Sequence, residues 1–247
     1  MDQFEERSTS AGRTPLFRVR VSVVVTVLLV AAIIIDLLFP LSIKLAELFN
    51  LPENADNRGF VHMFDLDGEG NLPAWYSSLL WAAAAVLAVL NGARSRAHGT
   101  GSWHWVALAG LLLLLSLDES ASLHESIGDV IAPLAPVTGG VFGWAWVFYG
   151  IALIVLALIL FGKFLLTLPP RIFITLGIAG LVFVGGALGA EMYGAAIADG
   201  TVAFLPGLNW TRLVMIEEFA EMLGVIIAIG ALLALLRGDE GTLVLAK

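Results

Sequence analysis

The chain has 247 residues, of which 59% are hydrophobic and 14% are charged, and its net charge is −8. Ordinary soluble domains are about 45–50% apolar and about 25% charged, so this composition excludes a typical soluble domain and indicates a polytopic membrane protein. The sequence contains no cysteine, which excludes disulfides, thiolate metal sites and cysteine nucleophiles. Basic residues are nowhere clustered enough to predict nucleic-acid binding. The expected partner is the lipid bilayer.

Apolar stretches long enough to cross a hydrocarbon core, which takes about 20 helical residues, recur along the chain. They cover residues 18–40, 74–94, 103–125, 142–166, 172–196 and 212–236. We therefore predict an all-α integral membrane fold, in which a bundle of six transmembrane helices occupies residues 16–237. Residues 41–73 form the predicted external loop, and residues 1–15 and 238–247 are predicted to be tails, the first of them disordered.

The distribution of basic residues predicts the orientation of the spans. Most lysines and arginines flank the spans on the side of the two termini, whereas Lys44, Arg58 and Arg212 fall on the other side. Both termini are therefore predicted to be cytoplasmic, and the chain is predicted to be a multi-pass protein of a bacterial inner membrane. Most acidic residues lie in the outer loops or the outer halves of the spans, so we expect the chemistry on the external side.

The third span ends in a cluster of ionisable residues, Ser116-Leu-Asp-Glu-Ser-Ala-Ser-Leu-His-Glu125. Ionisable groups at membrane depth are costly, and by default they indicate a functional site. If one helix continues through this cluster, Glu119 and His124 point to separate faces, and a single polar stripe is formed by Asp118, Ser122, Glu125 and Asp129.

Small residues recur along the fifth span and predict close helix packing. Gly185 and Gly189 form a G-x-x-x-G pair, and a second small-residue stripe follows at Gly186, Ala190 and Gly194. Such stripes let helices approach closely in lipid. The second and fourth spans contain no acidic residue and are predicted to be scaffold.

Acidic residues of the first, third, fifth and sixth spans are expected to meet in the outer half of the bundle. In the sixth span, Glu217 and Glu221 are spaced i,i+4 and therefore share a helix face. Several carboxylates in low dielectric cannot all be ionised without a counter-charge. We therefore predict a divalent metal site with the ligands Glu119, His124, Glu191, Glu218 and Glu221. The predicted catalytic residues are His124 and Glu125, and the further buried acids are Asp36, Asp118 and Glu217.

The identity of the metal follows from the available ligands. Oxygen-rich ligation favours manganese, iron, magnesium or calcium over copper or zinc. His98 and His104 fall on the cytoplasmic side, which leaves too few histidines for a three-histidine zinc site.

A weaker calcium-like pattern precedes the second span. Asp65, Asp67 and Glu69 alternate before Gly70, as in the first half of a calcium loop. The second half fails, because Tyr76 stands where a bidentate glutamate is expected. The alternative is a Gly/Asp turn leading into the helix.

Three other functions remain open. The acids could form a proton- or cation-coupled pathway, although the cytoplasmic halves of the spans offer few polar groups. A hydrolase would use Ser120 or Ser122 as its nucleophile and His124 as its base. A structural subunit of a membrane assembly would use the acids for hydrogen bonds between helices, with Arg212, Tyr193 and Asn209 as partners. A homo-oligomer and a membrane complex are both compatible with the sequence, which does not identify the substrate.

Three sequence blocks carry a family resemblance. They are Phe64-Asp-Leu-Asp with Asn71-Leu-Pro and Trp75, Leu117-Asp-Glu with His124-Glu125, and Glu217-Glu-Phe-Ala-Glu-Met-Leu-Gly224. Their combination resembles a set of uncharacterised bacterial polytopic membrane proteins in which the three blocks recur together. The resemblance covers the second, third and sixth spans and implies no particular activity.

Overall fold

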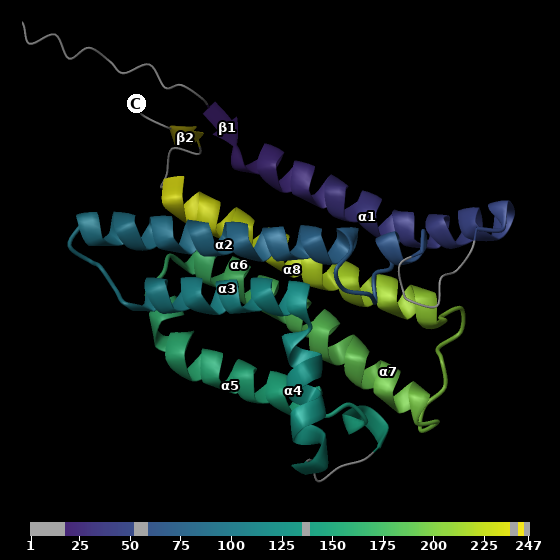
Figure 1. The fold of residues 1–247 in the computed structure, drawn as a ribbon. Coiled ribbons are helices and arrows are strands. Elements are labelled where there is room, and N and C mark those ends of the chain that lie inside the picture. Colours follow the sequence, from purple (N-terminus) through teal and green to yellow (C-terminus); the bar gives the residue numbers. More distant parts are fainter. Residues whose placement is uncertain (1–17, 52–58, 135–138, 238–241, 245–247) are drawn as a thin grey trace, which may run out of the picture.

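Six long apolar helices lie side by side and form the bundle (Figure 1). The computed structural model describes residues 18–51, 59–134, 139–237 and 242–244. The helices long and apolar enough to cross a membrane are Val21–Phe49 (α1), Leu72–Ala97 (α2), His104–Ala121 (α3), Trp146–Leu165 (α5), Pro170–Ala198 and Trp210–Arg237 (α8). The chain is therefore a multi-pass membrane protein, as the composition predicts.

Shorter elements connect these helices. The fifth span consists of α6 (Pro170–Val184), a π-helical turn η4 (Gly185–Ala190) and α7 (Glu191–Ala198). Helix α4 (Leu123–Ile131) follows α3, and short 3-10 turns cover His62–Phe64 (η1), Ala132–Leu134 (η2) and Gly140–Phe142 (η3).

Two three-residue strands join the ends of the described chain. Strand β1 (Arg18–Arg20) pairs antiparallel with β2 (Thr242–Val244), with Val19 opposite Leu243. Both ends of the bundle sequence therefore meet at the same end of the molecule (Figure 1), as expected for an even number of spans. The predicted tail 1–15 and most of the tail 238–247 lie outside the described residues.

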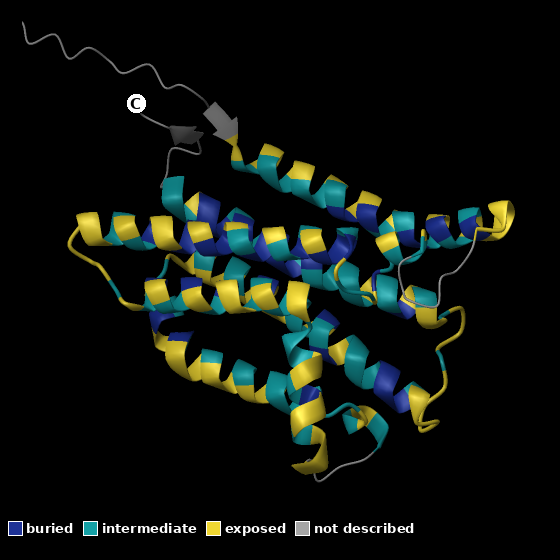
Figure 2. Cartoon of the chain, in the orientation of Figure 1, coloured by how far each residue is buried: buried dark blue, intermediate teal, exposed yellow. Residues whose placement is uncertain are grey.

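Helix α8 occupies the centre of the packing, in contact with α1, α2 and α6. The main core lies between α8 and α2, with contributions from α3 and α5. Small and large side chains interlock there, for example Ala84 and Ala88 of α2 beside Ile226 and Ile229 of α8, all 2% exposed or less. Exposed positions follow the outward faces of α1 and α5 (Figure 2), where apolar side chains are suited to lipid.

Two glycines allow α6 and α8 to approach closely. A Cβ added to Gly224 would lie 2.7 Å from the Cβ of Phe183, and one added to Gly186 would lie 2.7 Å from the carbonyl oxygen of Glu217. The prediction that Gly185 and Gly189 form a close helix contact is wrong. A Cβ added to either glycine would have no atom of another described element within 4 Å. Helix α8 packs on the other small-residue stripe, the one that includes Gly186.

The first helix is longer than predicted. Helix α1 continues through Pro40 to Phe49, so residues 41–49 extend the first helix and are not part of a separate loop. Proline removes one helical hydrogen bond, a cost that membrane helices tolerate when nearby groups take up the freed carbonyls. Beside it, the buried Ser42 hydroxyl donates to the carbonyl of Phe39 at 2.7 Å.

The third helix is shorter than predicted. It ends at Ala121, and Ser122 adopts a left-handed conformation with φ 45° before α4 begins at Leu123. The single polar stripe predicted from Asp118 to Asp129 is therefore wrong, because the two residues lie on different helices.

We expect Gly224→Ala to destabilise the protein, because the added methyl group overlaps the backbone of α6. Overpacking of this kind costs about 1–3 kcal/mol. Thermal unfolding in detergent measures the change, with Gly185→Ala as the matched control, since its methyl group meets no neighbour. Equal unfolding temperatures for the two variants would contradict the close α6–α8 contact.

Candidate functional site

Carboxylates from five parts of the chain line one cavity of about 160 Å³. We call it the acidic cavity. Its ionisable lining residues come from the loop before α2, from α3, α4, α7 and α8, and they are Asp67, Glu69, Asp118, Glu119, His124, Glu125, Glu191, Glu217, Glu218 and Glu221. Among the described residues that line it there is no lysine or arginine. All five predicted metal ligands are therefore brought to the same cavity.

A wider vestibule of about 670 Å³ adjoins the acidic cavity. The two share Asp67, His124, Glu125, Trp146, Glu191 and Glu217 in their linings. The vestibule also includes Asp129 and Trp210, both exposed side chains, so it reaches the surface of the protein. A solute can therefore approach the cavity along a path that is itself acidic.

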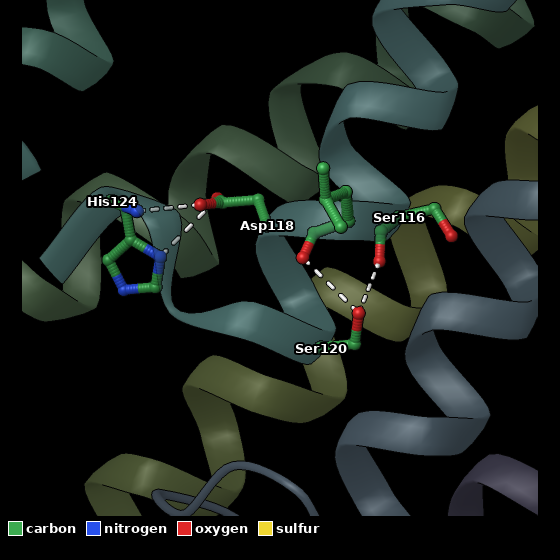
Figure 3. Close-up of polar contacts among 5 residues, drawn as sticks. Ser116, Asp118, Ser120 and His124 are labelled. Carbon is green, nitrogen blue, oxygen red and sulfur yellow. Dashed lines mark hydrogen bonds and ion pairs between the residues drawn. The ribbon is translucent and has the colours of Figure 1, made fainter. Parts of the chain in front are cut away.

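The break between α3 and α4 positions Asp118 and His124. Asp118 Oδ1 accepts a hydrogen bond from the backbone N–H of His124 at 2.7 Å, and its Oδ2 lies 3.3 Å from the ring Nδ1 (Figure 3). One carboxylate thus holds both the backbone and the ring of His124, and it leaves Nε2 on the far side of the ring (Figure 3). A straight helix would have pointed these two side chains to different faces.

The charges around His124 determine its titration. Burial lowers the pKa of His124, but the hydrogen bond with Asp118 and the negative charges of Asp118, Glu125 and Glu69 outweigh it, so the pKa lies above the ordinary value of 6.5. The ring therefore holds a proton more readily than an isolated histidine. An Asp–His pair of this kind can carry a proton into or out of the cavity.

The loop before α2 is built around the side chain of Asn71. Its amide nitrogen donates to the carbonyls of His62, Asp65 and Gly68 at 3.1, 2.6 and 2.8 Å, and its oxygen accepts from Ala74 N at 3.1 Å. The amide therefore occupies the centre of the segment that resembles a calcium loop, and the side chain also caps α2.

Two acidic residues of the same loop line the acidic cavity. Asp67 and Glu69 both line it, whereas Asp65 does not. Burial raises the pKa of Glu69, and contacts with Ser122 and His124 partly offset the effect. In the sequence these acids form a weak calcium-like pattern or a turn, separate from the main site. The structure brings Asp67 and Glu69 to the acidic cavity.

Several predicted participants lie elsewhere. Asp36 of α1 lines neither the acidic cavity nor the vestibule, so the prediction that the first span contributes to the site is wrong. The Arg212 guanidinium donates to the carbonyl of Gly207 and is absent from both linings. The Ser120 hydroxyl is exposed and donates to the carbonyls of Ser116 and Leu117 (Figure 3), so it is not directed at His124 as a nucleophile would be.

The walls of the cavity include aromatic residues that the sequence did not single out. Trp81 of α2 and Trp146 and Tyr149 of α5 line it, although both helices were predicted to be scaffold. The ring centroids of His124 and Trp146 lie 5.0 Å apart, at an interplanar angle of 61°. The sequence could not predict the contact between His124 and Trp146, because α4 and α5 are separated by a loop.

The described side chains do not form a ready-made metal centre. Within residues 18–51, 59–134 and 139–237, no three His, Asp or Glu side chains are arranged to hold a metal ion. Magnesium keeps several waters and is commonly held by one or two carboxylates, so a partly hydrated ion is compatible with the arrangement. The Ser77 hydroxyl is buried beside Glu119.

We expect Asp118→Asn to remove a pH-dependent part of the stability. Because the pKa of His124 is raised in the folded protein, its contribution is fully present below the ordinary value of 6.5 and is lost as the pH rises through the folded pKa. The difference in unfolding temperature between parent and variant should therefore be largest below pH 6.5 and should shrink over the range above it. Asn keeps an oxygen for the His124 N–H, which preserves the backbone geometry.

The matched control is Asp129→Asn, which removes an exposed acid of α4 that makes no contact with His124. Its unfolding temperature should follow that of the parent at every pH. A constant difference between the parent and Asp118→Asn across this range would contradict the assignment.

Comparison with known proteins adds one finding. No curated protein and no solved structure matches the chain. The sequence profile of a family described as a domain of unknown function (DUF8692) matches residues 21–236, from the start of α1 almost to the end of α8. The chain belongs to this DUF8692 family.

Proposed function

We propose that the protein binds a hard divalent cation in the acidic cavity, with access from the external side of the membrane. The observation that carries the proposal is the concentration of carboxylates from separate helices around one cavity, whose described lining residues include no lysine or arginine. Carboxylates so placed need a counter-charge, protons or water. A cation entering through the acidic vestibule supplies that charge.

The deep part of the cavity is the best place for the ion. Glu119 of α3 and Glu218 and Glu221 of α8 are partly buried and are supplied by helices that pack on the central core. Oxygen ligands favour magnesium, manganese, iron or calcium over copper or zinc, and a magnesium ion that keeps part of its water needs only one or two carboxylates.

The Asp118–His124 pair gives the site a route to catalysis. A divalent cation held in the cavity supplies Lewis-acid chemistry. His124, oriented by Asp118 through Nδ1, would accept or donate a proton at Nε2. We propose an external or lipid-borne substrate, because the vestibule reaches the surface beside the membrane-spanning helices.

No observation favours a transport pathway. Along α8 the acidic positions end at Glu221, and the buried residues that follow, from Met222 to Leu233, belong to the apolar core. That segment spans about 17 Å of helix. A continuous polar path would have to cross this core, so a binding site closed at its inner end agrees better with the packing.

Binding of Mn²⁺, measured by electron paramagnetic resonance on the detergent-solubilised protein with Mg²⁺ as competitor, tests the proposal. The parent should bind Mn²⁺ and release it to Mg²⁺. Glu119→Gln/Glu218→Gln should bind Mn²⁺ about 10–100-fold more weakly, because two cavity carboxylates lose their charge.

Glu47→Gln serves as the control, since Glu47 is exposed near the end of α1 and does not line the cavity. It should bind Mn²⁺ as the parent does. A parent that binds no Mn²⁺, or a double variant that binds it as tightly as the parent while remaining folded, would exclude this function.

A further inference from the structure

A second cavity, of about 980 Å³, lies at the opposite end of the bundle. It is formed where α2, α5 and α8 end and where α3 begins, together with the loops beside them. We call it the basic pocket. The apolar core between α2 and α8 separates it from the acidic cavity, so the two sites are independent.

The basic pocket has the opposite charge to the acidic cavity. Its ionisable lining residues are Arg94, His98, His104 and Lys163, and none of the described residues that line it is an aspartate or glutamate. Arg94 is already engaged, because its guanidinium donates to the carbonyls of Leu235 and Leu236 at the end of α8. Lys163, in the last turn of α5, is exposed. Its ammonium group is therefore the most available cation in the pocket.

The histidines of the pocket are held in place by local contacts. His98 Nδ1 lies 2.8 Å from the carbonyl of Arg94, so Nδ1 donates to it, and Nε2 is a donor toward an anion in the protonated ring. The ring of His104 stacks between Trp103 and Phe164, with centroid distances of 4.1 and 5.0 Å. Helix α3 starts at His104, so its positive end also faces this region. The Lys163 ammonium group and the positive end of α3 together suit an anion.

The remaining lining combines small polar side chains with an apolar wall. Trp105, Phe164 and Leu168 form part of the same pocket, next to the basic side chains. A free inorganic anion would make no favourable contact with these apolar side chains. A phospholipid would, because it has acyl chains as well as a phosphate. The pocket also lies at the ends of membrane-spanning helices, at the depth where lipid headgroups are found.

We propose that the basic pocket binds the phosphate of an anionic phospholipid, with the glycerol and the start of the acyl chains against Phe164 and Leu168. Basic pockets between transmembrane helices are suited to such headgroups. A zwitterionic lipid fits less well, because the part of the lining that the structure describes offers no carboxylate for a choline or ammonium group. The positive-inside distribution of basic residues places this pocket on the predicted cytoplasmic side.

Native mass spectrometry of the detergent-solubilised full chain tests the proposal with phosphatidylglycerol and phosphatidylcholine of the same acyl chains. Phosphatidylglycerol should bind more tightly to the parent. Lys163→Gln should weaken its binding about fivefold, since each basic group near an anionic headgroup contributes on the order of that factor. Lys163→Gln/His98→Gln should weaken it further.

The matched control is Arg171→Gln, which removes an exposed charge at the same end of the bundle outside the pocket lining. It should bind phosphatidylglycerol as the parent does. Equal binding of the two lipids by the parent, or unchanged binding by the double variant, would overturn the proposal. In a further arm with inorganic phosphate, binding of phosphate without retention of phosphatidylglycerol would overturn the lipid assignment.

Discussion

The close contact between α6 and α8 is the interaction on which the arrangement of the site depends. Gly224 and Gly186 remove the side chains that would hold the two helices apart. In lipid, helices gain little from hydrophobic burial against one another, so such close packing is a main source of association. Because α7 continues α6, the contact also brings Glu191 beside the carboxylates of α8. A helix spacing set by larger side chains would open the cavity and separate its acids.

The second constraint is the break at Ser122. A left-handed serine costs backbone energy, and such strain persists only where the surroundings compensate for it. Asp118 provides part of the compensation by accepting the His124 N–H and facing its ring. The same carboxylate therefore shapes the backbone and orients the imidazole. Structure and chemistry are coupled at this residue, which is why the Asp118–His124 pair is central to the proposed site.

The molecule has a pronounced charge polarity along its helices. Carboxylates gather around the cavity at one end, basic side chains gather around the pocket at the other, and the α2–α8 core fills the space between them. Apolar packing in the middle insulates the two regions from each other. We therefore propose a different ligand for each end, a cation at the acidic cavity and a phosphate group at the basic pocket.

The sequence by itself determined the six spans, the membrane class and most of the acids of the site, because hydrophobic length and rare charges in apolar stretches are local signals. Only the tertiary structure decided which faces meet. The periodicity of a sequence shows which residues share a helix face, but it does not show how that helix packs against its neighbours. It therefore could not predict that Asp36 lies outside the acidic cavity or that Glu69 lines it. The break at Ser122 and the aromatic wall from α5 likewise depend on contacts between elements distant in sequence or on a backbone choice that periodicity does not encode.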